Sequence, residues 1–197
     1  MNDSHSDKEY NKDYLINLIN EFKKLNNEAN LLYKDNKIEE SKNKFLEAYN
    51  LFEKESTKIN NEYYEDKNIN ELNIIYKNIL SNLALCYYSQ KKYNDAIIYD
   101  LKLIALEPKN VDCIIRLFYS YSKLDKYSQA VFFGDVFLEL EDEIKNKVED
   151  ISPKIMEEKT KLKKYQENYI RKNILRLFGS IIVILLSIIL FYIFKKK

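Results

Sequence analysis

The sequence contains little of what tight turns, disulfides and catalytic sites require. Its 197 residues include two Gly, two Pro, two Cys, one His and no Trp. A β-sandwich or β-barrel of this length needs many tight turns built on Gly, Pro or Asn-Gly pairs, and no Asn in the chain is followed by Gly. Two cysteines are too few for a disulfide scaffold or a zinc site. The composition therefore excludes a β-rich fold and favours a mostly helical protein with short loops.

Residues suited to catalysis are equally scarce. Catalysis needs a nucleophile or a general acid–base group in a shaped site, and the one histidine, His5, lies near the start of the chain. The chain has no Gly-rich phosphate-binding loop. We interpret Cys86 and Cys113 as small buried residues of helices rather than as reactive thiols, and the acidic stretch Glu139–Glu143 as a solvated face. We therefore predict a protein that is not an enzyme and that holds no cofactor and no metal.

The charges are separated along the chain. The formal net charge is +1, yet the six basic residues after Ile170 have no acidic residue among them. Residues 1–170 consequently hold 26 of the 32 basic residues and all 31 acidic ones, which gives them a net charge of −5. Nucleic-acid binding depends on the neutralisation of phosphates by basic residues. The acidic body therefore argues against a nucleic-acid partner.

An uncharged and mostly apolar run, Leu177–Phe194, lies near the C-terminus, and it extends back to Ile174 with only Arg176 inside it. A helix over this run spans about 27–32 Å, against about 30 Å for the hydrocarbon core of a bilayer. The alternative is a buried core helix. Because the N-terminus lacks the apolar stretch of a signal peptide, we expect a tail-anchored, single-pass integral membrane protein with a transmembrane helix over 174–194, a basic tail at 195–197 and a cytosolic body. The membrane would be the mitochondrial outer membrane or the endoplasmic reticulum.

The middle of the chain contains an internal repeat, in which residues 77–110 align with 111–144. Apolar, aromatic and small residues recur at matching positions. The matched pairs are Leu80 and Ile114, Leu83 and Leu117, Tyr87 and Tyr121, Tyr93 and Tyr127, and Ala96 and Ala130. The length of this repeat predicts helix–turn–helix units. Within a unit, the small residues let the two helices approach closely, and the tyrosines fill the space between them.

A weaker copy covers about 22–55, where the matching residues are Ala29, Tyr33, Ser41, Phe45 and Ala48. An insertion at 56–76 separates this copy from the next. Its first part, to residue 67, is polar, whereas Ile69, Leu72 and Tyr76 lie on one helical stripe that continues into the second repeat. We therefore expect the second half of the insertion to be helical.

After the third repeat, Ser152 and Pro153 indicate the start of another helix, because Ser is a good N-cap and Pro suits the first turn. Ile155, Leu162 and Tyr169 then recur at a regular heptad spacing. One interpretation is a solvated charged helix. We favour a linker and capping helix over 143–173, because a stack of repeats exposes its last face.

The stretch NLALCYYSQKKYNDAIIYDLKLIALEPKN resembles a tetratricopeptide (TPR) repeat. Three such repeats with an insertion after the first, followed by a capping helix, resemble the TPR domain of the large FKBP-type immunophilins and related co-chaperones. The resemblance covers residues 14–170, and we expect no isomerase domain of the kind that those proteins carry, because the 197 residues leave no length for it. The resemblance implies a three-repeat TPR helical solenoid over 8–142 with the C-terminal capping helix. Together with the transmembrane helix expected from the apolar run and a disordered N-terminus at 1–7, the predicted fold class is all-α.

The resemblance also implies a binding site on the first helices of the repeats. In chaperone-binding TPR domains, two Asn and several Lys or Arg clamp the C-terminal carboxylates of heat-shock chaperones of the 90 and 70 types. Three positions of that clamp are matched here, by Asn30, Asn82 and Arg116, whereas Asn26 and Asp112 stand where the family has Lys. Two further cations lie two helical turns before matched residues and could supply the missing charge from the same helix face. They are Lys23, before Asn30, and Lys109, before Arg116.

The resemblance thus implies an adaptor or co-chaperone that presents a peptide-binding groove to the cytosol. Two other readings stay open: that the matched residues are ordinary repeat residues in an Asn-rich chain, and that the protein is an organelle-surface scaffold, similar to the tail-anchored mitochondrial fission adaptor, which binds a folded protein. A basic groove would favour the clamp, and an apolar or acidic groove would favour the scaffold.

Overall fold

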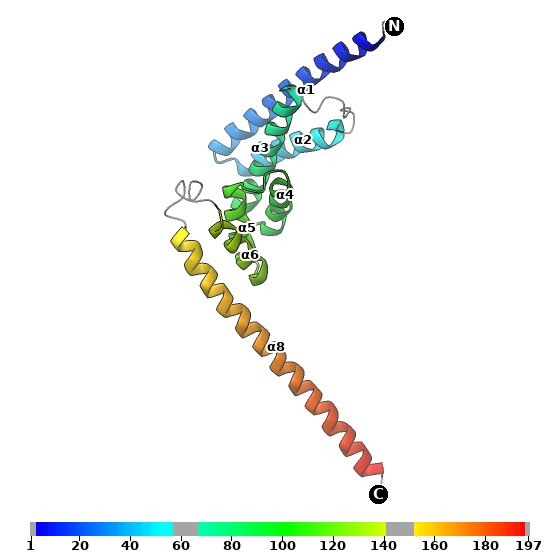
Figure 1. Cartoon of the computed structure of the whole chain (residues 1–197), viewed down its shortest axis with the longest axis vertical. Helices are drawn as coiled ribbons and strands as arrows, with labels where there is room; N and C mark the ends of the chain where they lie inside the picture. The colour runs from blue at the N-terminus through cyan, green and yellow to red at the C-terminus, as the bar shows by residue number, and fades with distance from the viewer. Residues whose placement is uncertain (1–2, 57–66, 141–151, 196–197) are drawn as a thin grey trace. The chain divides into compact units, whose positions relative to one another are not determined.

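The chain is seen here as a computed structural model, which describes residues 3–56, 67–140 and 152–195, with side chains described for 13–56, 68–140 and 153–177. Throughout these ranges the backbone forms helices joined by turns, without a strand (Figure 1). The helices are α1 (Asp3–Lys34), α2 (Ile38–Ser56), α3 (Lys67–Ser89), α4 (Tyr93–Leu106), α5 (Val111–Lys123), α6 (Tyr127–Leu138) and α8 (Ser152–Lys195). The chain divides into two compact units, residues 1–124 and 125–197.

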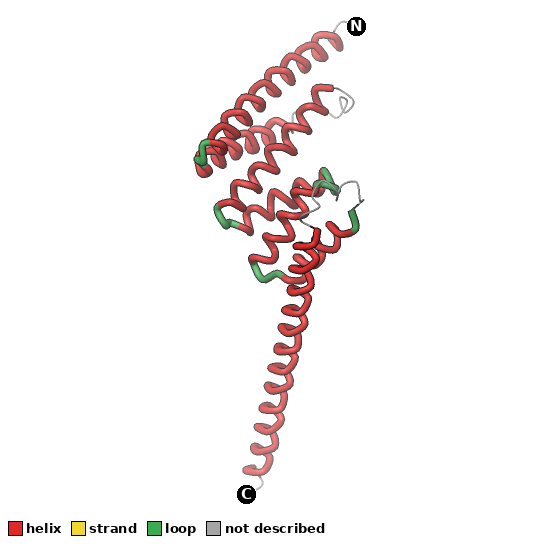
Figure 2. Tube along the Cα trace, turned by 90° about the vertical axis from the view of Figure 1, so that its left-hand side faces the viewer, coloured by secondary structure: helices red, strands yellow, loops and turns green. Residues whose placement is uncertain are grey.

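Two helical hairpins, α1–α2 and α3–α4, make up most of the first unit, and a short turn joins the helices of each (Figure 2). In each turn one residue has a left-handed backbone, Asn36 with φ 61° and Lys91 with φ 60°. The same two backbone hydrogen bonds, 2.9–3.0 Å long, close both helix ends in the manner of a Schellman motif. Asn36 and Lys91 are as far apart in the sequence as Ala29 and Ala84 are. The turn therefore recurs at one position of the repeat.

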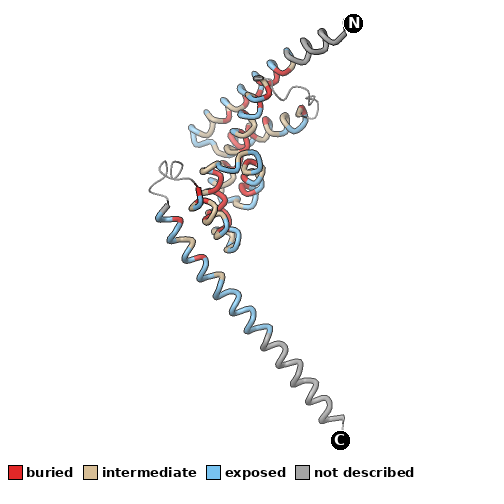
Figure 3. Tube along the Cα trace, in the orientation of Figure 1, coloured by how far each residue is buried: buried red, intermediate tan, exposed pale blue. Residues whose placement is uncertain are grey.

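Small side chains lie where the helices of the first unit meet. Ala29, Ala48, Ala84 and Ala96 are fully buried. Ala29 and Ala48 belong to a continuous hydrophobic cluster drawn from α1, α2 and α3, and Figure 3 shows buried positions along these helices. This arrangement agrees with the sequence alignment, because a larger side chain at any of these positions would hold the helices apart.

The insertion before the second repeat is described only in its second half. Residues 57–66 lie outside the described residues, and residues 67–76 form the first turns of α3. With 23 residues, α3 is longer than α4, which has 14. Since the chain reverses at 90–92, α4 ends beside the middle of α3, and the first turns of α3 extend past it. The structure also begins α1 at Asp3, which corrects the expectation that residues 3–7 are disordered.

In the second unit, α8 packs along α6. Lys159 pairs with Asp135 at 2.7 Å, and Gln166 donates a hydrogen bond of 3.0 Å to Ser128. The described part of α8 buries Ile155 and Leu162 but leaves Tyr169 64% exposed. The heptad stripe of the sequence therefore packs at its first two positions and is exposed at the third.

The prediction of a membrane anchor is not supported. Within the described residues, no helix combines the length and the apolar character that a membrane crossing needs. Charged side chains recur throughout residues 153–177 of α8, whereas a membrane-spanning helix needs about 20 mostly apolar residues. This finding overturns the predicted localisation as a tail-anchored integral protein of the mitochondrial outer membrane or endoplasmic reticulum. Of the predicted span at 174–194, side chains beyond residue 177 lie outside the described residues, as do those of the tail.

Candidate functional site

Helices α1 and α3 lie side by side and run in the same direction, because three polar contacts join them in the same order along both helices. Lys23 pairs with Glu71 at 2.6 Å. Asn82 Nδ2 donates to Asn30 Oδ1 at 3.3 Å, and the hydroxyls of Tyr33 and Ser89 lie 3.2 Å apart. Helix α5 joins this surface through Arg116, whose Nη2 lies 3.5 Å from the Ser81 hydroxyl of α3. We call the surface formed by these eight side chains the inner face.

The structure brings together two of the predicted site residues, Asn30 and Asn82. Both side chains are partly buried, and one hydrogen bond joins their amides. Among the described residues neither amide makes a second hydrogen bond. Whichever way the two amides are oriented, three of their four N–H hydrogens and one carbonyl oxygen lie outside that hydrogen bond, so the pair keeps at least one donor and one acceptor. A peptide group needs this combination, one donor and one acceptor.

A hollow of about 510 Å³ adjoins Asn30 on α1. Asn27, Leu31, Tyr33 and Lys34 line it with Asn30. Leu31 is 61% exposed, so an apolar side chain lies open to solvent beside the amide pair. The hollow can therefore receive a side chain of a peptide whose backbone meets the two asparagines.

Arg116, the third matched residue, is already engaged. Its guanidinium donates to the Asp100 carboxylate of α4, with Nε 3.1 and 3.0 Å from the two oxygens and Nη2 2.6 Å from Oδ1. Asp100 is fully buried and Arg116 is 9% exposed. Burial raises the pKa of Asp100 to about 6, and the charge of Arg116 opposes this rise. A peptide carboxylate would have to compete with Asp100 for this guanidinium.

The remaining cations of the predicted site, and the two positions where this chain lacks the lysine of the family, differ in their surroundings. Lys23 pairs with Glu71 across two half-exposed side chains. Lys109 is exposed in the turn before α5, and Asp112 is exposed in the first turn of that helix. Asn26 is partly buried, and its Oδ1 has no hydrogen-bond partner among the described residues. Since Lys23 and Arg116 both face carboxylates, the described inner face is compensated in charge rather than strongly basic.

Sequence reasoning missed the two carboxylates that pair with these cations. The resemblance to TPR repeats implies an aromatic residue at the position of Asp100, and this departure was the available signal. Glu71 falls in the insertion, where the repeat alignment says nothing about its neighbours. The cysteines agree with the interpretation as core residues: Cys86 and Cys113 are buried, and burial raises the pKa of both thiols.

No family model matches the sequence, and no curated protein does. The structure is similar to the C-terminal TPR-containing domain of an FK506-binding protein of Plasmodium falciparum, with a TM-score of 0.61 and 19% identity over 78% of this chain and 93% of that one. This chain has a TPR-type fold. The likeness confirms the all-α, TPR-like architecture predicted from the internal repeat. It gives no support to the predicted transmembrane helix. At this identity it shows the fold alone.

A second solved structure is similar over a comparable share of the chain. It is the Hsp90 co-chaperone Cns1 from Saccharomyces cerevisiae, with a TM-score of 0.49 and 21% identity over 77% of this chain. The similar region spans 45% of that protein's structure.

Proposed function

We propose that this chain is a TPR adaptor that holds an extended segment of a partner protein along its inner face. The pair formed by Asn30 and Asn82 carries the proposal, because two neighbouring helices contribute one amide donor and one acceptor at the same place. The adjoining hollow of about 510 Å³ supplies a position for a side chain of the same segment. Amide pairs of this kind hold a peptide backbone with little regard for its sequence, so the hollow would supply the selectivity.

The partner that we propose is the C-terminal peptide of a heat-shock chaperone of the 90 or 70 type, in line with the sequence resemblance. The amide donors of Asn30 and Asn82 would hold the terminal carboxylate, and Arg116, Lys23 and Lys109 would attract the acidic residues before it. Because Glu71 and Asp100 already neutralise two of these cations, we expect weak binding, with a Kd of about 10–100 μM. Binding should weaken as the salt concentration rises, because the charges are partly screened.

Calorimetry on the full chain tests this proposal with a chaperone C-terminal pentapeptide and its amidated form. The free acid should bind several-fold more tightly than the amide. Asn82→Ala should weaken binding of both forms, because it removes the amide pair. Asn43→Ala is the control, since Asn43 is an exposed residue of α2 that lies outside the inner face. Equal affinity for acid and amide would reject the chaperone terminus, and an unchanged Asn82→Ala variant would reject the inner face as the site.

The charge compensation of the inner face favours a second candidate function. A surface whose cations already pair with carboxylates attracts an acidic peptide only weakly. Such a surface is better suited to a folded partner that carries charges of both signs. The protein would then be a scaffold that binds a folded protein. In that case neither pentapeptide should bind, and Asp112→Lys, which replaces an acidic residue in the first turn of α5 by a basic one, should not create binding.

A further inference from the structure

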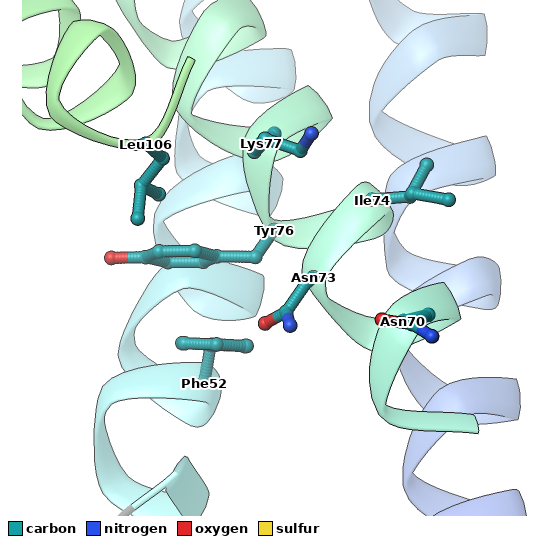
Figure 4. Close-up of a pocket in the computed structure, with 7 residues that line it drawn as sticks. All are labelled: Phe52, Asn70, Asn73, Ile74, Tyr76, Lys77 and Leu106. Carbon is teal, nitrogen blue, oxygen red and sulfur yellow. The ribbon is translucent and has the colours of Figure 1, made fainter. Parts of the chain in front are cut away.

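A second hollow, of about 730 Å³, lies on the first unit and shares no residue with the inner face. It lies where the first turns of α3 extend past the end of α4 (Figure 4). The lining residues come from α2, α3 and α4. They are Phe52, Asn70, Asn73, Ile74, Tyr76, Lys77 and Leu106. Its volume lies within the range of about 300–1,000 Å³ that is typical of small-ligand pockets.

One wall of this hollow is a fixed aromatic platform. The rings of Phe52 and Tyr76 stack with centroids 3.7 Å apart and planes 10° apart. Figure 4 shows the Tyr76 ring lying between Phe52 and Leu106. The Tyr76 hydroxyl donates a hydrogen bond of 2.6 Å to Glu53, which holds the ring in place. Leu106 and Ile74 are 53% and 55% exposed, so large apolar surfaces remain open beside the platform.

The polar groups of the hollow come from one stripe of α3. Asn70, Asn73 and Lys77 follow one another at steps of three and four along the helix and therefore share a face. Lys77 is the one charged residue among those that line the hollow in the described part of the chain. Its ammonium lies 4.0 Å from the Glu107 carboxylate, at the limit of an ion pair, and Glu107 also accepts a hydrogen bond of 3.2 Å from Asn110. An anion at the mouth of the hollow could approach Lys77 more closely.

We propose that this hollow binds an apolar carboxylate. The flat or branched apolar body would lie against the edges of the stacked Phe52 and Tyr76 rings and against Leu106, and the carboxylate would meet the Lys77 ammonium and the Asn73 amide. Two sources share this chemistry: a free organic acid, and the C-terminal residue of a polypeptide when that residue is large and apolar. This site shares no residue with the inner face, so an experiment that contradicts one proposal leaves the other unaffected.

Nitrogen-15 NMR titration of the full chain with 1-naphthoic acid tests the site, with 1-naphthamide as the uncharged analogue. We expect saturable shifts of the amide signals of residues 70–77, with a Kd of about 0.1–1 mM for the acid. The amide should bind about fivefold more weakly, because it cannot form the charge-assisted contact. A tripeptide, Ala-Ala-Phe with a free C-terminus, distinguishes the sources. Displacement of naphthoate by this peptide assigns the site to polypeptide C-termini, and its failure to displace naphthoate assigns the site to free acids.

Three variants make the test specific. Leu106→Asn should weaken binding of the acid by about fivefold or more, since it removes apolar contact. Ile98→Asn is the matched control, because Ile98 also lies on α4 and is also 53% exposed. Lys77→Gln should weaken binding of the acid and leave that of the amide unchanged. If Leu106→Asn fails to fold, Ile74→Asn replaces it. Absence of saturable binding, equal loss in Ile98→Asn, or equal affinity for acid and amide would overturn the proposal.

Discussion

Arg116 of α5 donates three hydrogen bonds to the carboxylate of Asp100 in α4, and both side chains are buried. The pair connects the second helix of one repeat to the first helix of the next. The pair also limits ligand binding at the inner face. The family resemblance predicts that Arg116 binds a ligand carboxylate, but Arg116 is already paired with Asp100 of the same chain. Arg116 therefore acts first as a structural residue, and any ligand must compete with Asp100.

We expect Asp100→Ala to lower the free energy of unfolding by about 3–5 kcal/mol, because it leaves a buried guanidinium without its carboxylate. Asp100→Asn should cost less, since the amide oxygen still accepts one hydrogen bond from Arg116. Urea denaturation of the full chain, followed by circular dichroism, measures both variants. A loss under about 1 kcal/mol in Asp100→Ala would show that the pair is solvated and does not hold α4 and α5 together.

The raised pKa of Asp100 predicts a particular pH dependence. Its folded value of about 6 exceeds the ordinary value of 3.8, so the folded state binds the proton more tightly than the unfolded state. The stabilising contribution of this proton is fully present below about pH 4 and is lost as the pH rises through 6, by up to about 3 kcal/mol. The difference in stability between the parent protein and Asp100→Asn should therefore decrease from pH 4 to pH 7. An increase over this window would mean that the Arg116 charge outweighs burial.

The sequence predicts the repeat architecture well because its determinants are local. The recurrence of Ala29, Ala84 and Ala96 at matching positions of the repeats indicates where helices pack and which positions must be small. Such features depend on neighbours within one hairpin. The all-α TPR-type fold could therefore be anticipated, including the helical second half of the insertion.

The contacts of the inner face were less predictable, since they depend on the register between separate helices. Asn30 and Asn82 are 52 residues apart, and the carboxylate partners of Lys23 and Arg116 come from an insertion and from an unusual repeat position. The repeat period carries no information on such pairings. The prediction of a membrane anchor was based on the apolar composition of residues 174–194, and no expected contact with the rest of the fold supported it.

We expect Ala96→Leu to lower the free energy of unfolding by about 1–3 kcal/mol, because the fully buried Ala96 has no room for a larger side chain. Ala105→Leu is the matched control, since Ala105 lies on the same helix but is exposed. Thermal denaturation of both variants gives the comparison. Equal melting temperatures for the parent, Ala96→Leu and Ala105→Leu would contradict the packing of α4 described above.

The left-handed turn at Lys91 offers a gain in stability. Lys91 has φ 60°, a conformation in which a β-carbon is crowded by the backbone and which Gly adopts freely. Because Gly also adds entropy to the unfolded chain, the net gain of Lys91→Gly should be modest, about 0.5–1 kcal/mol. Lys24→Gly is the control, because Lys24 is an exposed lysine in the interior of α1, where Gly should destabilise by about 0.5–1 kcal/mol. Urea denaturation should therefore show midpoints that move in opposite directions for the two variants. Movement in the same direction would mean that the effect comes from loss of a lysine charge rather than from the backbone.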